Sequence, residues 1–307
     1  MNTRAILVQT GLVLFGTVVA AHAQYNLNAD LSADQTVQVS PHVWVIRGFP
    51  NVAMVVGSTG TLVVDTGLGA RNGAFLAQSA LNRSSKGAKL YLTTTHYHPE
   101  HASGDGGFPV GTTVIRPRIQ QQELEADGQN MIDMFSKRSE SNRALLEGAK
   151  VRPADVLFGG SYTLDLGGGV RVRLLWFGPA HTRGDEVVMV DPDSVLVAGD
   201  VVQNKTGPQF YCSECTPKKW LQVLDQVLPL DAKIVVPDHS PPGDGSLVNA
   251  EREFMRDLVG RIEALKGQGK SLDDTKSIIT REFQAKYPDW ASMNRIGDAV
   301  ERGYKDN

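Results

Sequence analysis

The chain has 307 residues, of which 41% are hydrophobic and 21% are charged, which excludes a disordered, collagen-like or polytopic membrane protein. Its 31 Lys and Arg against 34 Asp and Glu give a net charge of -3, too little positive charge for a nucleic-acid partner. We therefore expect one large α/β domain with an appendage, or two modest domains, acting on a small-molecule substrate.

The first 23 residues have the pattern of a secretory signal peptide. Arg4 supplies a positive charge near the start, residues 5–19 are mostly apolar, and Ala21-His22-Ala23 has the A-x-A form of a cleavage site. We predict cleavage before Gln24. The alternative is an uncleaved membrane anchor, but the apolar run is shorter than the ~20 residues of a span. Residues 1–23 are thus predicted as a signal peptide, and the mature protein as periplasmic or secreted without stable membrane insertion.

The mature chain begins with short β-rich runs. Residues 43–46, 52–56 and 61–65 predict strands, and the glycine-bounded residues 57–60 predict a hairpin turn, so we expect an antiparallel sheet. Residues 70–81 predict a helix. Residues 89–95 predict a strand that leads directly into His96, and ligands in α/β sheets gather at the carboxyl ends of strands.

The middle of the chain repeats this pattern. Residues 119–150 are polar and free of proline, which predicts one or two amphipathic helices. Strand character then returns, followed by a helix and a last strand; the strands are 161–164, 170–177, 187–190, 195–200 and 233–237, and the helix is 220–228. Two strand-rich halves predict two sheets packed face to face with helices outside.

The composition changes to charged, helix-forming sequence after residue 245. Residues 247–266 predict one helix, and Ser271 opens a capping box before another. We therefore predict a catalytic domain over residues 24–245 and a helical C-terminal extension over residues 246–307. The aromatic residues Tyr287 and Trp290 are expected to dock on an apolar surface.

The chain has two cysteines, Cys212 and Cys215. A structural zinc site with four thiolates is excluded. In an exported protein a short-loop disulfide is favoured over free thiols or a redox-active pair, and such a bond mainly stiffens its loop.

Four short motifs together carry five of the seven histidines and several acidic residues. These motifs are T-H-Y-H-P-E-H with His96, His98, Glu100 and His101; G-P-A-H-T-R-G-D with His181; V-A-G-D-V with Asp200; and P-D-H-S-P with His239. Imidazoles and carboxylates together suit zinc, iron or manganese, whereas calcium requires oxygen ligands. Three histidines within six residues indicate two metals, because the i and i+2 side chains of an extended strand face the same ion and Pro99 then turns the chain.

In the same order, these motifs resemble the H-x-H-x-D-H, G-H-T-x-G-D, G-D and G-H-G series of the metallo-β-lactamase-fold hydrolases, in a glyoxalase II-like form. The resemblance covers residues 43–240 and implies a four-layer αββα sandwich with a dinuclear metal site at one edge. It implies that the first metal is held by His96, His98 and His181, the second by Glu100, His101 and His239, and that Asp200 bridges them. Asp65 resembles the strand-end aspartate that buttresses the histidine loop.

Two departures from the family pattern concern the second metal. Glu100 stands where the family has Asp, and His239 is flanked by Asp238 and Ser240 in place of glycines. Glu100 is expected to ligate with an adjusted loop, to act as a base on a metal-bound water, or to leave that metal weakly held. The expected cofactor is zinc, as two ions if the second site fills, with iron or manganese as alternatives.

The chemistry implied is attack of a metal-held hydroxide on an ester, lactone or related acyl substrate, with Asp200 and Glu100 as the catalytic carboxylates. β-Lactam hydrolysis is the first alternative, although β-lactamases of this fold resemble one another in having Cys or Ser at the place of Asp200. An iron-dependent oxidoreductase and a non-catalytic metal-binding accessory protein are further alternatives. The stretch 203–211 is expected to form one wall of the pocket, with Lys205, Phe210 and Tyr211 available for contacts, or else an ordinary surface loop.

Overall fold

The structure is a computed structural model that describes residues 29–150 and 152–306. The predicted signal peptide and its cleavage site lie outside the described residues. Among the described residues, no helix combines the length and the apolar character needed to cross a bilayer.

The first sheet has seven strands in sequence order. They are β1 (Thr36–Ser40), β2 (Val43–Ile46), β3 (Val52–Val56), β4 (Gly60–Val64), β5 (Lys89–Thr93), β6 (Thr113–Pro117) and β7 (Val156–Phe158). Strands β1 to β4 pair antiparallel, as predicted for this part of the chain, and β4 to β7 pair parallel. The carboxyl ends of β4 and β5 therefore meet at one edge.

The second sheet has six strands in the order β13-β12-β11-β10-β9-β8. They are β8 (Ser161–Gly167), β9 (Val170–Trp176), β10 (Glu186–Asp191), β11 (Val195–Gly199), β12 (Ile234–Pro237) and β13 (Gly243–Asp244). Strands β11 and β12 are parallel to each other, so their carboxyl ends also lie together.

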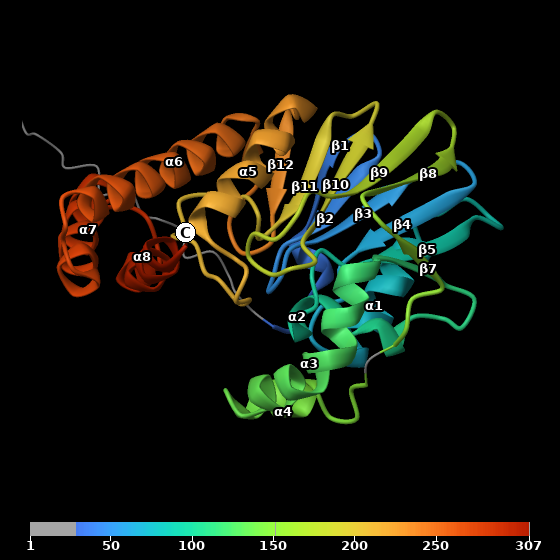
Figure 1. Ribbon diagram of the computed structural model, residues 1–307. Helices are drawn as coiled ribbons and strands as arrows, with labels where there is room; N and C mark the ends of the chain where they lie inside the picture. The colour runs from blue at the N-terminus through green and yellow to red at the C-terminus, as the bar shows by residue number, and fades with distance from the viewer. Residues whose placement is uncertain (1–28, 151, 307) are drawn as a thin grey trace, which may run out of the picture.

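The two sheets pack face to face (Figure 1), and a valine-rich core fills the space between them. The buried residues of this sheet interface include Val43, Val55, Leu62, Val64, Leu164, Leu174, Val188, Val190, Val197 and Val236. On the other face of the first sheet, α1 (Gly69–Leu81) packs Leu76 and Ala80 against Met54 and Val63. Helices thus cover the outside of two stacked sheets, and the predicted αββα sandwich is confirmed.

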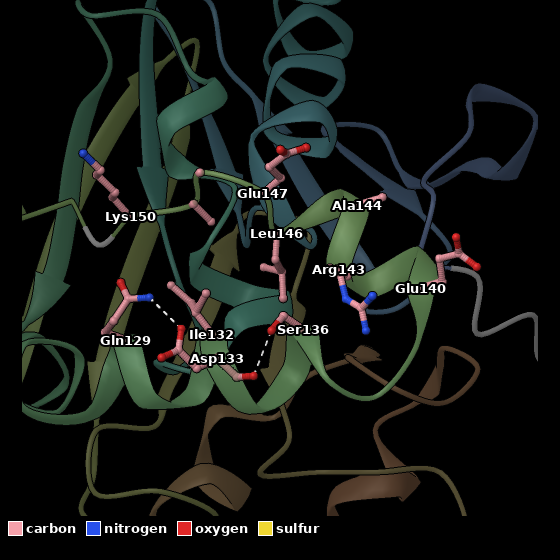
Figure 2. A pocket seen from close by; sticks show the side chains of 12 residues that line it. Gln129, Ile132, Asp133, Ser136, Glu140, Arg143, Ala144, Leu146, Glu147 and Lys150 are labelled. Carbon is pink, nitrogen blue, oxygen red and sulfur yellow. Dashed lines mark hydrogen bonds between the residues drawn. The ribbon is translucent and has the colours of Figure 1, made fainter.

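The long polar segment after β6 forms α3 (Arg118–Ser136) and α4 (Glu140–Leu145). These two helices border an open cavity of about 680 Å³, shown in Figure 2. Its walls carry charges of both signs, including Asp133, Arg143 and Glu147, and none of the motif histidines lines it.

The C-terminal helices share a core with the outer face of the second sheet. They are α6 (Ser246–Gly267), α7 (Leu272–Lys286) and α8 (Ile296–Lys305); α6 and α8 pack against α5 (Pro217–Val227), and α7 packs against α6 and α8. Ser271 caps α7 by accepting a hydrogen bond from the backbone N–H of Asp274, as its capping box predicts. Trp290 stacks on Phe254 of α6, with ring centroids 4.7 Å apart, so the predicted docking of the aromatic turn is on the extension itself.

Candidate metal centre

The four motifs come together at one edge of the sandwich, where strands of both sheets end. His96 follows β5, and Pro99 begins a short helix α2 (Pro99–Ala102) that carries Glu100 and His101. In the second sheet, His181 lies between β9 and β10, Asp200 follows β11 and His239 follows β12. All seven residues that the sequence singled out as ligands thus lie at this edge.

The ring nitrogens of His96, His98 and His181 converge on one point. The Nε2 of His96 is 3.0 Å from the Nδ1 of His98, which is 3.4 Å from the Nε2 of His181. A tetrahedral zinc ion with Zn–N bonds of about 2.05 Å requires its nitrogen ligands to lie about 3.3 Å apart. The spacing of these three imidazoles fits one such ion.

A second group forms on the adjacent side. The Nε2 atoms of His101 and His239 are 3.3 Å apart, again the spacing of two ligands of one ion. The Oε1 of Glu100 is farther away, 3.9 Å from the His101 nitrogen and 4.0 Å from that of His239. Glu100 is therefore within reach of this second position but is the outlying member of its group.

Asp200 lies between the two groups. Its Oδ2 is 3.2 Å from the Nε2 of His181, and its Oδ1 is 3.6 Å from the Nε2 of His239. Each carboxylate oxygen thus faces a different group of imidazoles, an arrangement that would allow Asp200 to bridge two ions.

Outer hydrogen bonds fix which nitrogen of two imidazoles faces the centre. The Nδ1 of His101 is 3.0 Å from the Oδ2 of Asp65, and the Nδ1 of His181 is 2.8 Å from the carbonyl oxygen of Gln209. In each pair Nδ1–H donates outward and leaves the Nε2 lone pair free to bind a cation. Asp65 is itself held by the backbone N–H of Thr95, at 2.7 Å.

The electrostatics of this edge also fit a cation. Burial raises the pKa of the Glu100 carboxyl to about 8 and raises the pKa of Asp65, Asp200 and Asp238 as well. Over the described parts of the chain, no Lys or Arg pairs with any of these four carboxyl groups. Burial also lowers the pKa of the motif histidines, to about 4 for His239, which keeps the imidazoles in the neutral form that binds metals.

Several buried polar atoms at this edge have no hydrogen-bond partner. They include His98 Nε2, Glu100 Oε2, Asp238 Oδ1 and His239 Nδ1. Such atoms are rare in folded proteins because each costs free energy. The converging imidazole nitrogens and the carboxyl groups without a Lys or Arg partner together fit a centre of two divalent transition-metal ions.

Asp185 supports the loop that carries His181. Its carboxylate accepts hydrogen bonds from the backbone N–H and the hydroxyl of Thr182, and from the backbone N–H of Ala180. Asp185 is the last residue of the G-P-A-H-T-R-G-D motif, four residues after His181, and this spacing is the signal in the sequence that points to its role.

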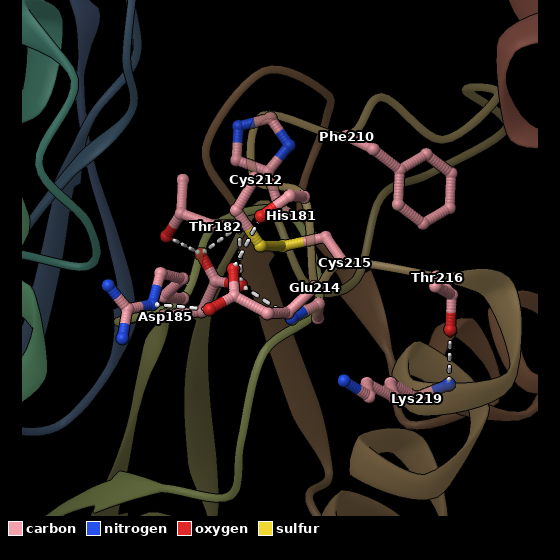
Figure 3. Close-up of a disulfide and its surroundings, with 12 residues drawn as sticks. His181, Thr182, Asp185, Phe210, Cys212, Glu214, Cys215, Thr216 and Lys219 are labelled. Atoms are coloured by element: carbon pink, nitrogen blue, oxygen red, sulfur yellow. Dashed lines mark hydrogen bonds and ion pairs between the residues drawn. A yellow bond between two sulfur atoms is a disulfide. The ribbon is translucent and has the colours of Figure 1, made fainter. Parts of the chain in front are cut away.

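A disulfide stiffens the loop that covers one side of the centre (Figure 3). Cys212 and Cys215 are bonded, as expected, and Arg302 of α8 donates hydrogen bonds to the carbonyl oxygens of Cys212 and Phe210. The ring of Tyr211 lies 4.5 Å from that of His98, between centroids. This loop therefore holds an aromatic side chain directly against the histidine cluster.

The predicted pocket wall after Asp200 is only partly as expected. Lys205 forms an exposed ion pair with Asp289, and Phe210 packs on Trp220, so of the three side chains named from the sequence only Tyr211 contacts the motif histidines. A small cavity of about 40 Å³ adjoins the centre instead. It is lined by His181, Asp200, Gln203, Thr206, Gly207, Pro208, Gln209, Trp220, His239 and Glu251.

Comparison with known proteins agrees with this fold. The family model described as the metallo-beta-lactamase superfamily matches residues 45–239. The chain is similar to a metallo-beta-lactamase from Pontibacter korlensis, with a TM-score of 0.58 and 19% identity over 74% of this chain and 99% of that chain. It is similar to the DIM-1 metallo-beta-lactamase, with a TM-score of 0.57 and 18% identity over 74% of this chain and 98% of that chain. It is also similar to the stereoselective inverting sec-alkylsulfatase Pisa1 from Pseudomonas sp., with a TM-score of 0.63 and 15% identity over 88% of this chain and 49% of that chain.

Proposed function

Because this chain belongs to the metallo-beta-lactamase superfamily, we propose that it is a metal-dependent hydrolase that cleaves an ester, a lactone or a related acyl substrate. The observation that carries the proposal is the convergence of five imidazoles and Asp200 on two adjacent points, with ring nitrogens 3.0 to 3.4 Å apart within each group. This spacing supports two ions, and zinc is the metal we expect.

In this proposal His96, His98 and His181 hold the first ion, and Glu100, His101 and His239 hold the second. Asp200 is shared by both. Divalent ions in such a centre lower the pKa of water toward ~7 and polarise the oxygen of an acyl group.

The remaining roles belong to the protein's own side chains. Asp65 keeps the Nδ1 proton of His101 turned outward, at 3.0 Å, so that the opposite nitrogen remains a ligand. Glu100, the outlying member of its group, is proposed to ligate at long reach or to accept a proton. Tyr211 is 37% exposed and lies against His98, so its ring is available to an incoming substrate.

We expect esters and lactones to be better substrates than β-lactams. An amine leaving group needs a proton, and we assign no described residue as its donor. The Cys212–Cys215 disulfide supports export to an oxidising compartment, where a β-lactamase would also act, so β-lactam hydrolysis is the alternative to be tested.

The test begins with metal analysis of the purified mature protein, which should carry between one and two zinc ions. Aryl ester, lactone, penicillin and carbapenem hydrolysis is then measured before and after chelation, with zinc restored as the control. We expect kcat/KM to be highest on an ester or lactone and to vanish on chelation. Faster turnover of a β-lactam would reverse the ranking of substrates. Bound metal without turnover would favour an accessory protein, and bound iron with oxygen consumption would favour an oxidoreductase. An active metal-free protein would refute the metal centre.

A further inference from the structure

Helix α6 carries one charged residue in its buried, otherwise apolar face. The buried residues of the helix are Val248, Glu251, Phe254, Met255, Leu258, Ile262 and Leu265, and Glu251 is 1% exposed. A carboxyl group at such a position costs stability, and an apolar residue of similar size would pack without that cost. Polar groups that break a local pattern in this way are expected at functional sites.

Glu251 reaches the edge of the metal centre. It lines the cavity of about 40 Å³ together with Asp200 and His239, and its Oε2 has no hydrogen-bond partner. The described His, Asp and Glu residues that lie close enough together to hold an ion do not include Glu251. Glu251 therefore borders the centre without being one of its ligands.

The backbone N–H of Gln203 links Glu251 to the centre. Both residues line the same small cavity, and the backbone N–H of Gln203 lowers the pKa of the Glu251 carboxyl group against the larger rise caused by burial. The side chain of Gln203 in turn donates from Nε2 to the Oδ1 of Asp200, at 2.6 Å. Polar contacts thus lead from Glu251 of the C-terminal extension through Gln203 to Asp200, which lies between the two groups of imidazoles.

Gln203 also supports the loop of His239. Its Oε1 accepts a hydrogen bond from the hydroxyl of Ser240 at 2.8 Å, and that hydroxyl accepts one from the backbone N–H of Asn204 at 2.7 Å. Both hydrogen-bonding functions of the Gln203 amide are therefore used at the centre. A shift of Gln203 would disturb Asp200 directly and His239 through its neighbour.

We propose that Glu251 is a positioning residue through which the C-terminal extension fixes Gln203 and, through Gln203, orients Asp200. This role rests on the metal centre proposed above. Loss of an outer partner of a metal ligand typically lowers metal affinity 10- to 100-fold, and we expect an effect of that size here.

The test replaces Glu251 by an apolar residue and by its amide. Glu251→Met removes the acceptor, and we expect zinc affinity, measured against a competing chelator, to fall by about 10- to 100-fold while the metal-free protein melts at the same temperature or higher. Glu251→Gln keeps an oxygen that can accept from Gln203 N–H, so its affinity should stay within about threefold of wild type. Glu253→Gln, an exposed glutamate of the same helix, is the matched control.

A double-mutant cycle tests the route through Gln203. Gln203→Met alone should weaken zinc binding, and adding Glu251→Met should then cost less than about a further twofold. Wild-type zinc affinity in either single variant would overturn the proposal, and the Gln203 variant decides it even if Glu251→Met does not fold. Intact zinc affinity with a raised KM for substrate in Glu251→Met would also overturn it, because Glu251 would then contact the substrate. A wild-type protein without metal would instead refute the proposed function.

Discussion

The sheet interface and the metal-centre edge are both buried, but the interface is lined by apolar side chains and the edge by polar ones. The interface is packed with valine and leucine, including Leu174, Val188 and Val190, all 0% exposed. The edge holds five imidazoles and four carboxyl groups, several with atoms that lack a partner. The interface stabilises the fold by apolar burial, whereas burial of the polar groups at the edge costs stability that a bound cation would offset. Stability and function are thus separated in space, and mutations should separate them in the same way.

The largest expected effect is on activity at the edge. Asp200→Ala should lower kcat/KM on the best ester or lactone by at least about 100-fold, a loss of roughly 2.7 kcal/mol in transition-state stabilisation. The metal-free variant should unfold at the same urea concentration as wild type or higher, because a buried carboxyl group without a cation has been removed. A fall in both activity and metal-free stability would contradict the contrast between the two regions.

Leu174→Ala should have the opposite signature. Removing a fully buried side chain from the sheet interface should cost about 2–5 kcal/mol in the free energy of unfolding. Zinc stoichiometry of the folded fraction should not change. Urea unfolding and metal analysis of the same sample check both statements, and a loss of zinc at unchanged stability would be evidence against them.

The pH dependence of stability should also differ between the two regions. Burial raises the pKa of Glu100 to about 8. In the metal-free folded protein this carboxyl holds a proton that the unfolded chain has already released, so stability should fall as the pH rises from about 5 to about 8. Glu100→Gln cannot titrate, so the metal-free variant should gain stability relative to wild type over this range. Leu174→Ala serves as the control whose difference from wild type is flat with pH.

A smaller effect is expected on occupancy of the second ion. If Glu100 is a ligand at long reach, Glu100→Asp, which matches the family pattern, should raise the zinc content, and Glu100→Gln should lower it. Elemental analysis of dialysed protein measures both. Identical stoichiometry in wild type and the two variants would show that Glu100 does not bind the metal.

The smallest effect should come from the disulfide. Replacing Cys212 and Cys215 by serine opens a very short loop and should cost less than about 2 kcal/mol of stability. Since this loop carries Tyr211, KM should change more than kcat. Protein isolated without reductant should show no alkylatable thiol; fully labelled cysteines would count against the bond or against export.

The sandwich and the candidate ligands could be predicted from the sequence because both depend on local signals. These signals are the valine-rich runs and the motifs at strand ends. The sequence did not predict β6, whose Arg116 suggests an exposed segment. In the structure this Arg116 is fully buried and donates hydrogen bonds to Asp105 and to the carbonyl oxygen of Arg152. It also missed Glu251, because a single glutamate in a helix reads as a surface residue until its partner, 48 positions away, is known.

The candidate ligands lie on loops of two different sheets, and this determines when in folding a metal ion can bind. His101 and His239 are separated by 138 residues, and each follows the strands of a different sheet. Contacts between residues so far apart in the sequence form slowly, and neither half of the chain contains a complete binding site. Metal loading should therefore be a late step of folding, after the two sheets have formed and packed together.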